Sequence, residues 1–274
     1  MNRIVLFFCV SILALGAMSA DEAGAPVKHS PVPGVSDEEW AQLPPKERMM
    51  RVVGGMIPNK TTGEGSVAII DIQGKVSAEF VRKCAERLED VTWFRVNYSK
   101  PENAVAFTDL EPCVKAAKGN ASVVVGEFSG LPRVVVLPEL HAAVVNVQAL
   151  TADADDQKLK ERVAKEISRA FAFCFGVFSS DRPGVLDAAP SIKDLDALLV
   201  DMFTQDVVFE IERPAAKLGI KRFGRIMYKH ACERGIAPPP KNKWQQRIFD
   251  EVKAQRAKDA EKGIKIEFDP KKGK

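Results

Sequence analysis

The strongest repeat in the chain runs from Arg162 to Gly176. Apolar residues recur there at steps of three and four positions, which is the spacing of one buried helix face. These residues are Val163, Ile167, Ala170, Phe171, Cys174, Phe175 and Phe178. The opposite positions are charged and predict a solvated face, and they are Glu161, Lys165, Glu166 and Arg169. Because glycine readily adopts the left-handed conformation that closes a helix, Gly176 marks the predicted end.

The pattern before this helix predicts an α/β sheet. A β-branched run, a helical repeat and an alternating run form a strand-helix-strand unit at 67–72, 76–89 and 92–98. Three further strands are expected at 122–126, 133–137 and 143–147. Short loops separate these three strands, so we expect them to be antiparallel neighbours. The predicted fold class is therefore α/β, with a mixed twisted sheet and helices.

A mostly helical C-terminal part follows. Helical patterns cover 191–200, 204–218 and 224–234, and the prolines at 238–240 then interrupt them. Asn242 is the predicted cap of a long amphipathic helix with Trp244, Ile248 and Val252 on one side. This stripe favours packing within the chain over a partner surface. An alternating run at 264–268 predicts an edge strand.

The N-terminus has the pattern of a secretory signal peptide. A basic start at Asn2-Arg3 precedes an apolar run at 4–15 and small residues before Asp21. We therefore predict a signal peptide at 1–20, an exported protein (periplasmic or secreted) and no stable membrane span after cleavage. A Pro/Gly-rich linker arm is predicted at 21–50, an α/β domain at 51–207 and a helical extension at 208–274.

Composition adds two constraints. The formal net charge is only +3 at pH 7, and much of the excess lies near the C-terminus, so we predict no nucleic-acid partner. Cleavage of the leader leaves Cys84, Cys113, Cys174 and Cys232, none in the close spacing of a zinc knuckle or redox dithiol. We favour free, largely buried thiols over disulfides.

Few residues offer catalytic chemistry. The three histidines, His29, His141 and His230, lie far apart in sequence. No nucleophile elbow, phosphate loop or dinucleotide fingerprint occurs. A metal site assembled from the last two histidines with Cys174 and Cys232 remains an alternative.

One part of the chain resembles the archaemetzincin family of zinc peptidases. It has a strand at 143–147, a polar loop, the helix with Lys165-Glu-Ile-Ser-Arg169, and then Gly184-Val-Leu and 191–196. In that family the helix carries His-Glu-x-x-His, whose histidines share a zinc ion while the glutamate polarises the metal-bound water. The resemblance covers roughly residues 66–207 and implies a metzincin-like α/β fold.

The residues that define this motif are replaced. Glu166 stands at the position of the general base, whereas Lys165 and Arg169 stand at the two histidines. Phe175 stands at the position of the third histidine, and Leu186 stands at the methionine of the methionine turn. Residues 203–207 stand where the family has a Cys-x-x-Cys. Lysine and arginine are protonated at neutral pH and repel a metal cation. The resemblance therefore implies a pseudoenzyme, with no catalytic residue, metal or cofactor.

Three functions follow from these observations. The first is an exported, non-catalytic binding or envelope-associated module for a protein or peptide ligand of unknown identity. In it, Lys165, Glu166 and Arg169 are candidates to bind an anionic group or peptide carboxylate. The second is an active hydrolase, through an unrecognised metal site or through Glu166 with another partner. The third is a structural protein whose helical C-terminal part docks a partner chain.

Overall fold

The computed structural model describes residues 30–72, 76–103, 105–181 and 183–261. The predicted signal peptide and the predicted strand at 264–268 lie outside these residues. The chain forms two compact units. We call Pro58–Arg225 the α/β unit, and we call the other, whose described residues are 30–57 and 226–261, the split unit.

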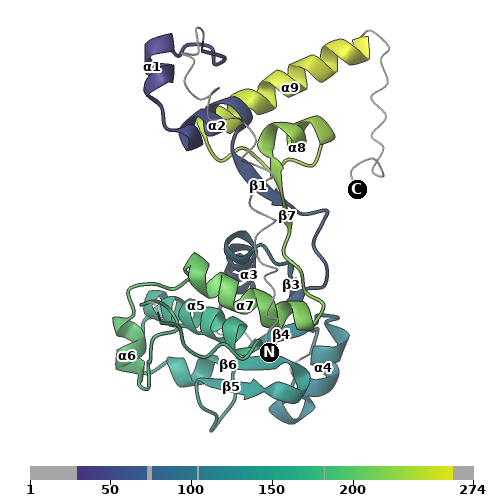
Figure 1. The fold of residues 1–274 in the computed structure, drawn as a ribbon. Coiled ribbons are helices and arrows are strands. Elements are labelled where there is room, and N and C mark those ends of the chain that lie inside the picture. Colours follow the sequence, from purple (N-terminus) through teal and green to yellow (C-terminus); the bar gives the residue numbers. More distant parts are fainter. Residues whose placement is uncertain (1–29, 73–75, 104, 182, 262–274) are drawn as a thin grey trace, which may run out of the picture. The chain divides into compact units, whose positions relative to one another are not determined.

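The α/β unit is built on a five-stranded sheet with the order β3-β2-β4-β6-β5 (Figure 1). The strands are β2 (Val67–Asp71), β3 (Val96–Ser99), β4 (Ala121–Gly126), β5 (Val134–Leu137) and β6 (Ala142–Asn146). Every residue of β2, β4 and β6 is buried. Their β-branched side chains suit a sheet that is covered on both faces. The predicted α/β class with a mixed sheet is confirmed.

Helices cover both faces of this sheet. One face packs under α3 (Ala78–Thr92), α5 (Asp156–Phe173) and α7 (Gln205–Lys217), with Ile69, Val123 and Val145 in one core cluster. The alternate strand residues point the other way and pack with Leu110 and Val114 of α4 (Leu110–Ala116). Three short 3-10 turns, η3 (Phe107–Asp109), η4 (Pro138–Leu140) and η5 (Val147–Leu150), connect these elements.

The pairing of the last three strands differs in part from the prediction. Strand β5 is antiparallel to β6 as expected, but β4 pairs with β6 in parallel and does not contact β5 as a neighbour. After β4 the chain forms the edge strand β5 first, and then adds β6 between β4 and β5. Buried Asn146 fixes this route, since its amide donates to the carbonyls of Phe128 and Leu131 at 2.8 Å each. A loop secured by one side chain leaves no periodic signal.

Helix α5 forms where the apolar repeat predicts it. Asp155 caps its start by accepting from the Lys158 amide at 2.8 Å, and Gly176 adopts a φ of +75° just after its end. Six of the seven apolar residues of the repeat are buried, and Phe171 packs against Phe175 with ring centroids 5.5 Å apart. Phe178 lies beyond the helix and is 55% exposed, so the predicted helix and its buried face are confirmed except at this residue.

The split unit takes its helices from both ends of the described chain. They are α1 (Asp37–Gln42), α2 (Pro45–Val53), α8 (Tyr228–Arg234) and α9 (Lys243–Glu261). Asn242 caps α9 as predicted, and its side-chain oxygen accepts from the amides of Trp244 and Gln245 at 3.1 and 3.0 Å. The helix predicted at 224–234 begins only at Tyr228, because 224–227 pair as strand β7 (Gly224–Met227) with β1 (Met56–Asn59).

The two units divide the chain at other points than the predicted domains. Residues 37–50 of the predicted linker arm are largely helical and belong to the split unit. Val208, Ile211 and Ala215 of α7 lie in the same core cluster as α5. The α/β unit therefore continues to Arg225, beyond the boundary predicted at 207.

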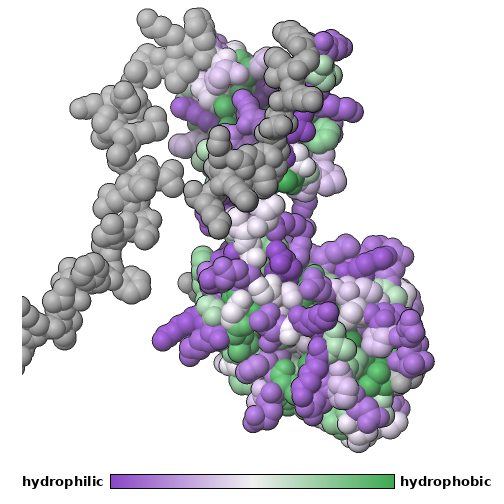
Figure 2. Space-filling view, turned by 90° about the vertical axis from the view of Figure 1, so that its right-hand side faces the viewer, coloured by the Kyte–Doolittle hydropathy of each residue, from purple (hydrophilic) through white to green (hydrophobic). Residues whose placement is uncertain are grey.

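The surface and the thiols add two findings. Hydrophilic side chains cover much of the face in Figure 2, with smaller apolar patches between them. No helix in the described ranges is long and apolar enough to cross a bilayer. The four cysteines are free, as predicted, and burial raises the pKa of the Cys174 thiol to about 12. These thiols behave as small apolar groups.

Candidate functional site

Three of the four charged residues that the sequence assigns to the solvated face of α5 are buried, whereas Glu161 is exposed. The exposed fraction is 9% for Lys165, 1% for Glu166 and 9% for Arg169. The Glu166 carboxylate lies between two guanidiniums, 3.2 Å from Arg133 Nη1 and 3.2 Å from Arg169 Nε. Glu166 and Arg169 form an i,i+3 ion pair, and the prediction of a solvated face was wrong for Lys165, Glu166 and Arg169.

The cations of this cluster hold the segment that follows α5. Lys165 Nζ donates to the Leu195 carbonyl at 3.0 Å, and Arg169 Nη1 donates to the carbonyls of Val185 and Asp187, both at 2.8 Å. Arg133, which directly precedes the edge strand β5, donates to the carbonyls of Ala189 and Ser191. The three side chains thus bind backbone oxygens along 185–195. The predicted ligand-binding role of Lys165, Glu166 and Arg169 stays a prediction, and these internal contacts do not favour it.

A second clamp lies one turn earlier on the same helix. Arg162 is 2% exposed, and its Nε and Nη2 reach Asp196 Oδ1 and Oδ2 at 2.7 Å each. Its Nη1 donates to the Leu150 carbonyl at 2.8 Å. These bonds lower the pKa of Asp196 to about 2, with Arg162 as the main cause. Asp196 belongs to α6 (Ile192–Ala197), so this ion pair fixes α6 on α5.

Sequence reasoning missed Arg162, Arg133 and Asp196. The one local signal is that Arg162, Lys165 and Arg169 fall at i, i+3 and i+7, which places three cations on one helix stripe. Such a stripe needs anionic or carbonyl partners whether it is exposed or buried. Nothing near Arg133 in the sequence indicates that it reaches α5.

The electrostatics of Glu166 are set by burial. Desolvation raises the pKa of the Glu166 carboxyl, although the guanidiniums of Arg169 and Arg133 act to lower it. Burial likewise lowers the pKa of Arg169. Glu166 Oε2 and Arg169 Nε form an ion pair without the alignment of a hydrogen bond. The cluster is a compact internal charge network.

A metal ion does not fit this donor set. The groups beside Glu166 are an ammonium and two guanidiniums, which cannot coordinate a cation and repel it. The described residues contain no group of three or more His, Cys, Asp or Glu placed to hold a metal ion. His141 and Cys174, two residues of the alternative metal site, both line one apolar pocket of the α/β unit. The Cys174 thiol, however, donates to the Ser122 carbonyl at 3.1 Å.

The other positions of the resemblance are part of the apolar core. Phe175, Leu186 and Phe203 are 7%, 3% and 7% exposed and belong to the cluster that includes Phe171. The Phe203 ring lies with its centroid 5.9 Å from that of Phe171. These side chains supply packing where the resemblance would place metal ligands and supporting groups.

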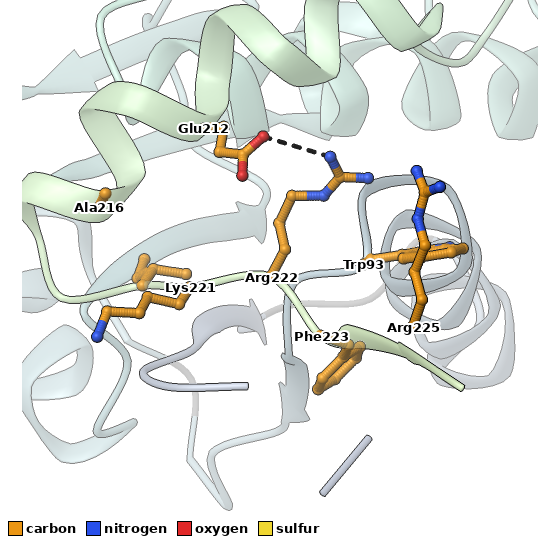
Figure 3. A pocket seen from close by; sticks show the side chains of 8 residues that line it. Trp93, Glu212, Ala216, Lys221, Arg222, Phe223 and Arg225 are labelled. Atoms are coloured by element: carbon orange, nitrogen blue, oxygen red, sulfur yellow. Dashed lines mark hydrogen bonds and ion pairs between the residues drawn. The ribbon is translucent and has the colours of Figure 1, made fainter. Parts of the chain in front are cut away.

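A solvent-accessible cavity of about 360 Å³ lies elsewhere on the α/β unit, beside Trp93 (Figure 3). It is lined by Trp93, Glu212, Ala216, Ile220, Lys221, Arg222, Phe223 and Arg225. We call it the Trp93 pocket. Three cations and one carboxylate border it, and Lys221 also pairs with Glu64 at 2.6 Å between Nζ and Oε2. The sequence analysis did not single out any of these residues.

Comparison with known proteins gives similarity in structure alone. No protein family matches the sequence, and no curated protein is similar to it. The archaemetzincin of Methanopyrus kandleri is 19% identical, with a TM-score of 0.42 over 56% of this chain and 96% of that one. A zinc-dependent peptidase of Methanocorpusculum labreanum is 16% identical, with a TM-score of 0.43 over 54% of this chain and 100% of that one.

A third solved structure adds to the comparison. The archaemetzincin of Archaeoglobus fulgidus, complexed with malonate, is 17% identical, with a TM-score of 0.40 over 53% of this chain and 99% of that one. The chain is thus similar in structure to archaemetzincins over about half of its length.

Proposed function

We propose that this protein is an exported, non-catalytic binding module. The observation that supports the proposal is the state of Glu166, which is 1% exposed and lies between the guanidiniums of Arg133 and Arg169. A general base must reach a water molecule or a substrate proton within hydrogen-bonding distance. A carboxylate enclosed by two cations and shielded from solvent does not offer that access.

The neighbouring cations support the same conclusion. Lys165 donates to the carbonyl of Leu195, and Arg169 donates to the carbonyls of Val185 and Asp187. These bonds take the place that a metal centre has in a zinc peptidase site, where ligands from separate segments converge. The helix and the segment after it are held together by side chains instead. A fold maintained in this way is suited to binding rather than hydrolysis.

We expect the purified full chain to contain close to zero zinc per molecule after mild dialysis, by elemental analysis. We also expect no cleavage of casein or of a mixed peptide library above the level of a Glu166→Gln variant. The reason is that the Glu166 cluster repels cations and excludes water. About one zinc per chain, together with Glu166-dependent cleavage, would establish the alternative of an active hydrolase.

Export is a separate element of the proposal. We expect the protein recovered outside the cytoplasm to lack the first 20 residues or so, because the basic start, apolar run and small residues form a cleavable leader. Mass spectrometry of its N-terminal peptide measures this directly. Recovery of a chain that retains Met1 from the cytoplasmic fraction would contradict export.

A further inference from the structure

We propose that the Trp93 pocket binds a phosphate monoester, through Arg225 and Arg222 beside the Trp93 ring. The inference rests on the proposed function of a binding module and names the ligand class of that module. Its volume of about 360 Å³ suits a small molecule rather than a folded partner. The pocket lies wholly within the α/β unit and shares no residue with the Glu166 cluster.

The wall of the pocket is held in place before any ligand arrives. Trp93 follows α3 with a φ of +60°, its amide donates to the Glu89 carbonyl at 2.8 Å, and its own carbonyl accepts from the Phe223 amide at 2.7 Å. Phe223 is buried and packs close to Gly63. A ring fixed at both backbone ends is a rigid surface, and rigidity lowers the entropic cost of binding.

Arg222 is likewise oriented by its neighbours. Its Nε donates to the Thr92 carbonyl at 2.9 Å, and its Nη1 lies 3.3 Å from Glu212 Oε2. The guanidinium carbon lies 5.7 Å from the centre of the Trp93 ring. Its Nη2 forms no hydrogen bond or ion pair with the residues that the structure describes, so that nitrogen can donate to a ligand.

Arg225 supplies the main unused donors. Its guanidinium carbon lies 5.6 Å from the centre of the Trp93 ring, a cation–π contact that orients the group without using its N–H donors. Within the described ranges, its guanidinium forms no hydrogen bond or ion pair. Figure 3 shows the two arginine side chains extending in the same direction beside Trp93. Their donors can therefore converge on one oxyanion.

The number of acceptor oxygens favours a phosphate monoester over a carboxylate. Glu212 pairs with Arg222, and Glu64 pairs with Lys221 at 2.6 Å between Oε2 and Nζ, so Arg225 is the cation of the lining that has no ion-pair partner among the described residues. A phosphate monoester carries a charge of about −1.5 to −2 at pH 7 and three acceptor oxygens. Guanidiniums bind such groups through paired, charge-assisted hydrogen bonds. A carboxylate offers only two oxygens, so it accepts fewer of the donors that Arg222 and Arg225 present.

The experiment is isothermal titration calorimetry of the purified full chain with phenyl phosphate, inorganic phosphate and benzoate at low ionic strength. We expect phenyl phosphate to bind at least about tenfold more tightly than benzoate. Arg225→Ala should weaken phenyl phosphate binding about tenfold or more, because it removes the unused donors. Arg213→Ala is the matched control, since Arg213 is an exposed arginine of α7 outside the pocket. The affinity of the Arg213→Ala variant for phenyl phosphate should stay within about twofold of wild type.

The pH dependence gives a second readout. Because the second pKa of a phosphate monoester is about 6, binding should weaken as the pH falls from 7.5 to 5. Tighter binding of phenyl phosphate than of inorganic phosphate would show that the ring also contacts Trp93, and equal affinity would show that the phosphate group is sufficient.

Three results would overturn the assignment: no saturable binding up to about 10 mM, benzoate binding as tightly as phenyl phosphate, or an unchanged affinity in Arg225→Ala. None of these affects the non-catalytic function, which fails only on zinc content and cleavage.

Discussion

Glu166→Gln will lower the free energy of unfolding by about 3 kcal/mol. The amide keeps the shape of the side chain but removes the negative charge between Arg133 and Arg169, which lie 3.2 Å from its two oxygens. Two largely buried guanidiniums are then left without a counter-charge, and the loss of one partner from a buried ion pair is costly. Urea unfolding followed by circular dichroism measures the change.

Glu161→Gln is the control for this change. Glu161 lies on the same helix and is exposed, with Gln157 as its hydrogen-bond partner at 2.8 Å. We expect its effect to stay within about 0.5 kcal/mol. Equal stabilities for the two variants would contradict the view that the Glu166 cluster holds the segment after α5. The burial of Lys165 and Arg169 also means that reversing both charges would not spare the fold, contrary to the expectation for a solvated face.

Arg162→Met has the second large expected effect, again a loss of about 3 kcal/mol in the free energy of unfolding. Methionine fills much of the same volume but removes the guanidinium that donates to the Asp196 carboxylate and to the Leu150 carbonyl. Lys158→Met is the control, because Lys158 also reaches Asp196, at 3.1 Å, from a side chain that is 44% exposed. We expect that control to cost less than about 1 kcal/mol.

The same pair predicts how stability changes in acid. The pKa of Asp196 falls from an ordinary value of 3.8 to about 2 in the folded chain. The folded state therefore holds Asp196 ionised where the unfolded state protonates it, so the contribution is complete above about pH 5 and is lost as the pH falls through 3.8 toward 2. In Arg162→Met the slope of stability against pH in that window should become shallower. An identical slope would show that Arg162 does not set the pKa of Asp196.

Local patterns were enough to predict most elements of the α/β unit, although helix α4 was not predicted. The β-branched runs of β2, β4 and β6 and the apolar repeat of α5 are each contained in one stretch of sequence. The position of β5 at the sheet edge cannot be predicted from one stretch of sequence, because it depends on Asn146 binding the carbonyls of Phe128 and Leu131 across the loop. Strand order is a property of such tertiary contacts, whereas strand existence is a property of composition.

The candidate sites were less accessible to prediction for the same reason. Lys165, Glu166 and Arg169 have the spacing of an exposed charged face, and only the later segment at 185–196 buries them. The Trp93 pocket joins parts of the chain that are far apart, since Arg222 donates to the carbonyl of Thr92, 130 positions away. No window of sequence contains both residues.

The division of the chain into an uninterrupted α/β unit and a split unit has a consequence for synthesis on the ribosome. All residues of the α/β unit, Pro58–Arg225, emerge before α8 and α9. Helix α2 emerges before the α/β unit. The Gly54 carbonyl at its end accepts a hydrogen bond from Gln245 at 3.0 Å, and Gln245 is synthesised 191 positions later. Folding in order of emergence therefore completes the five-stranded sheet while the N-terminal helices still lack their partners. A nascent chain that stalls after Arg225 holds an assembled sheet and an unfinished second unit.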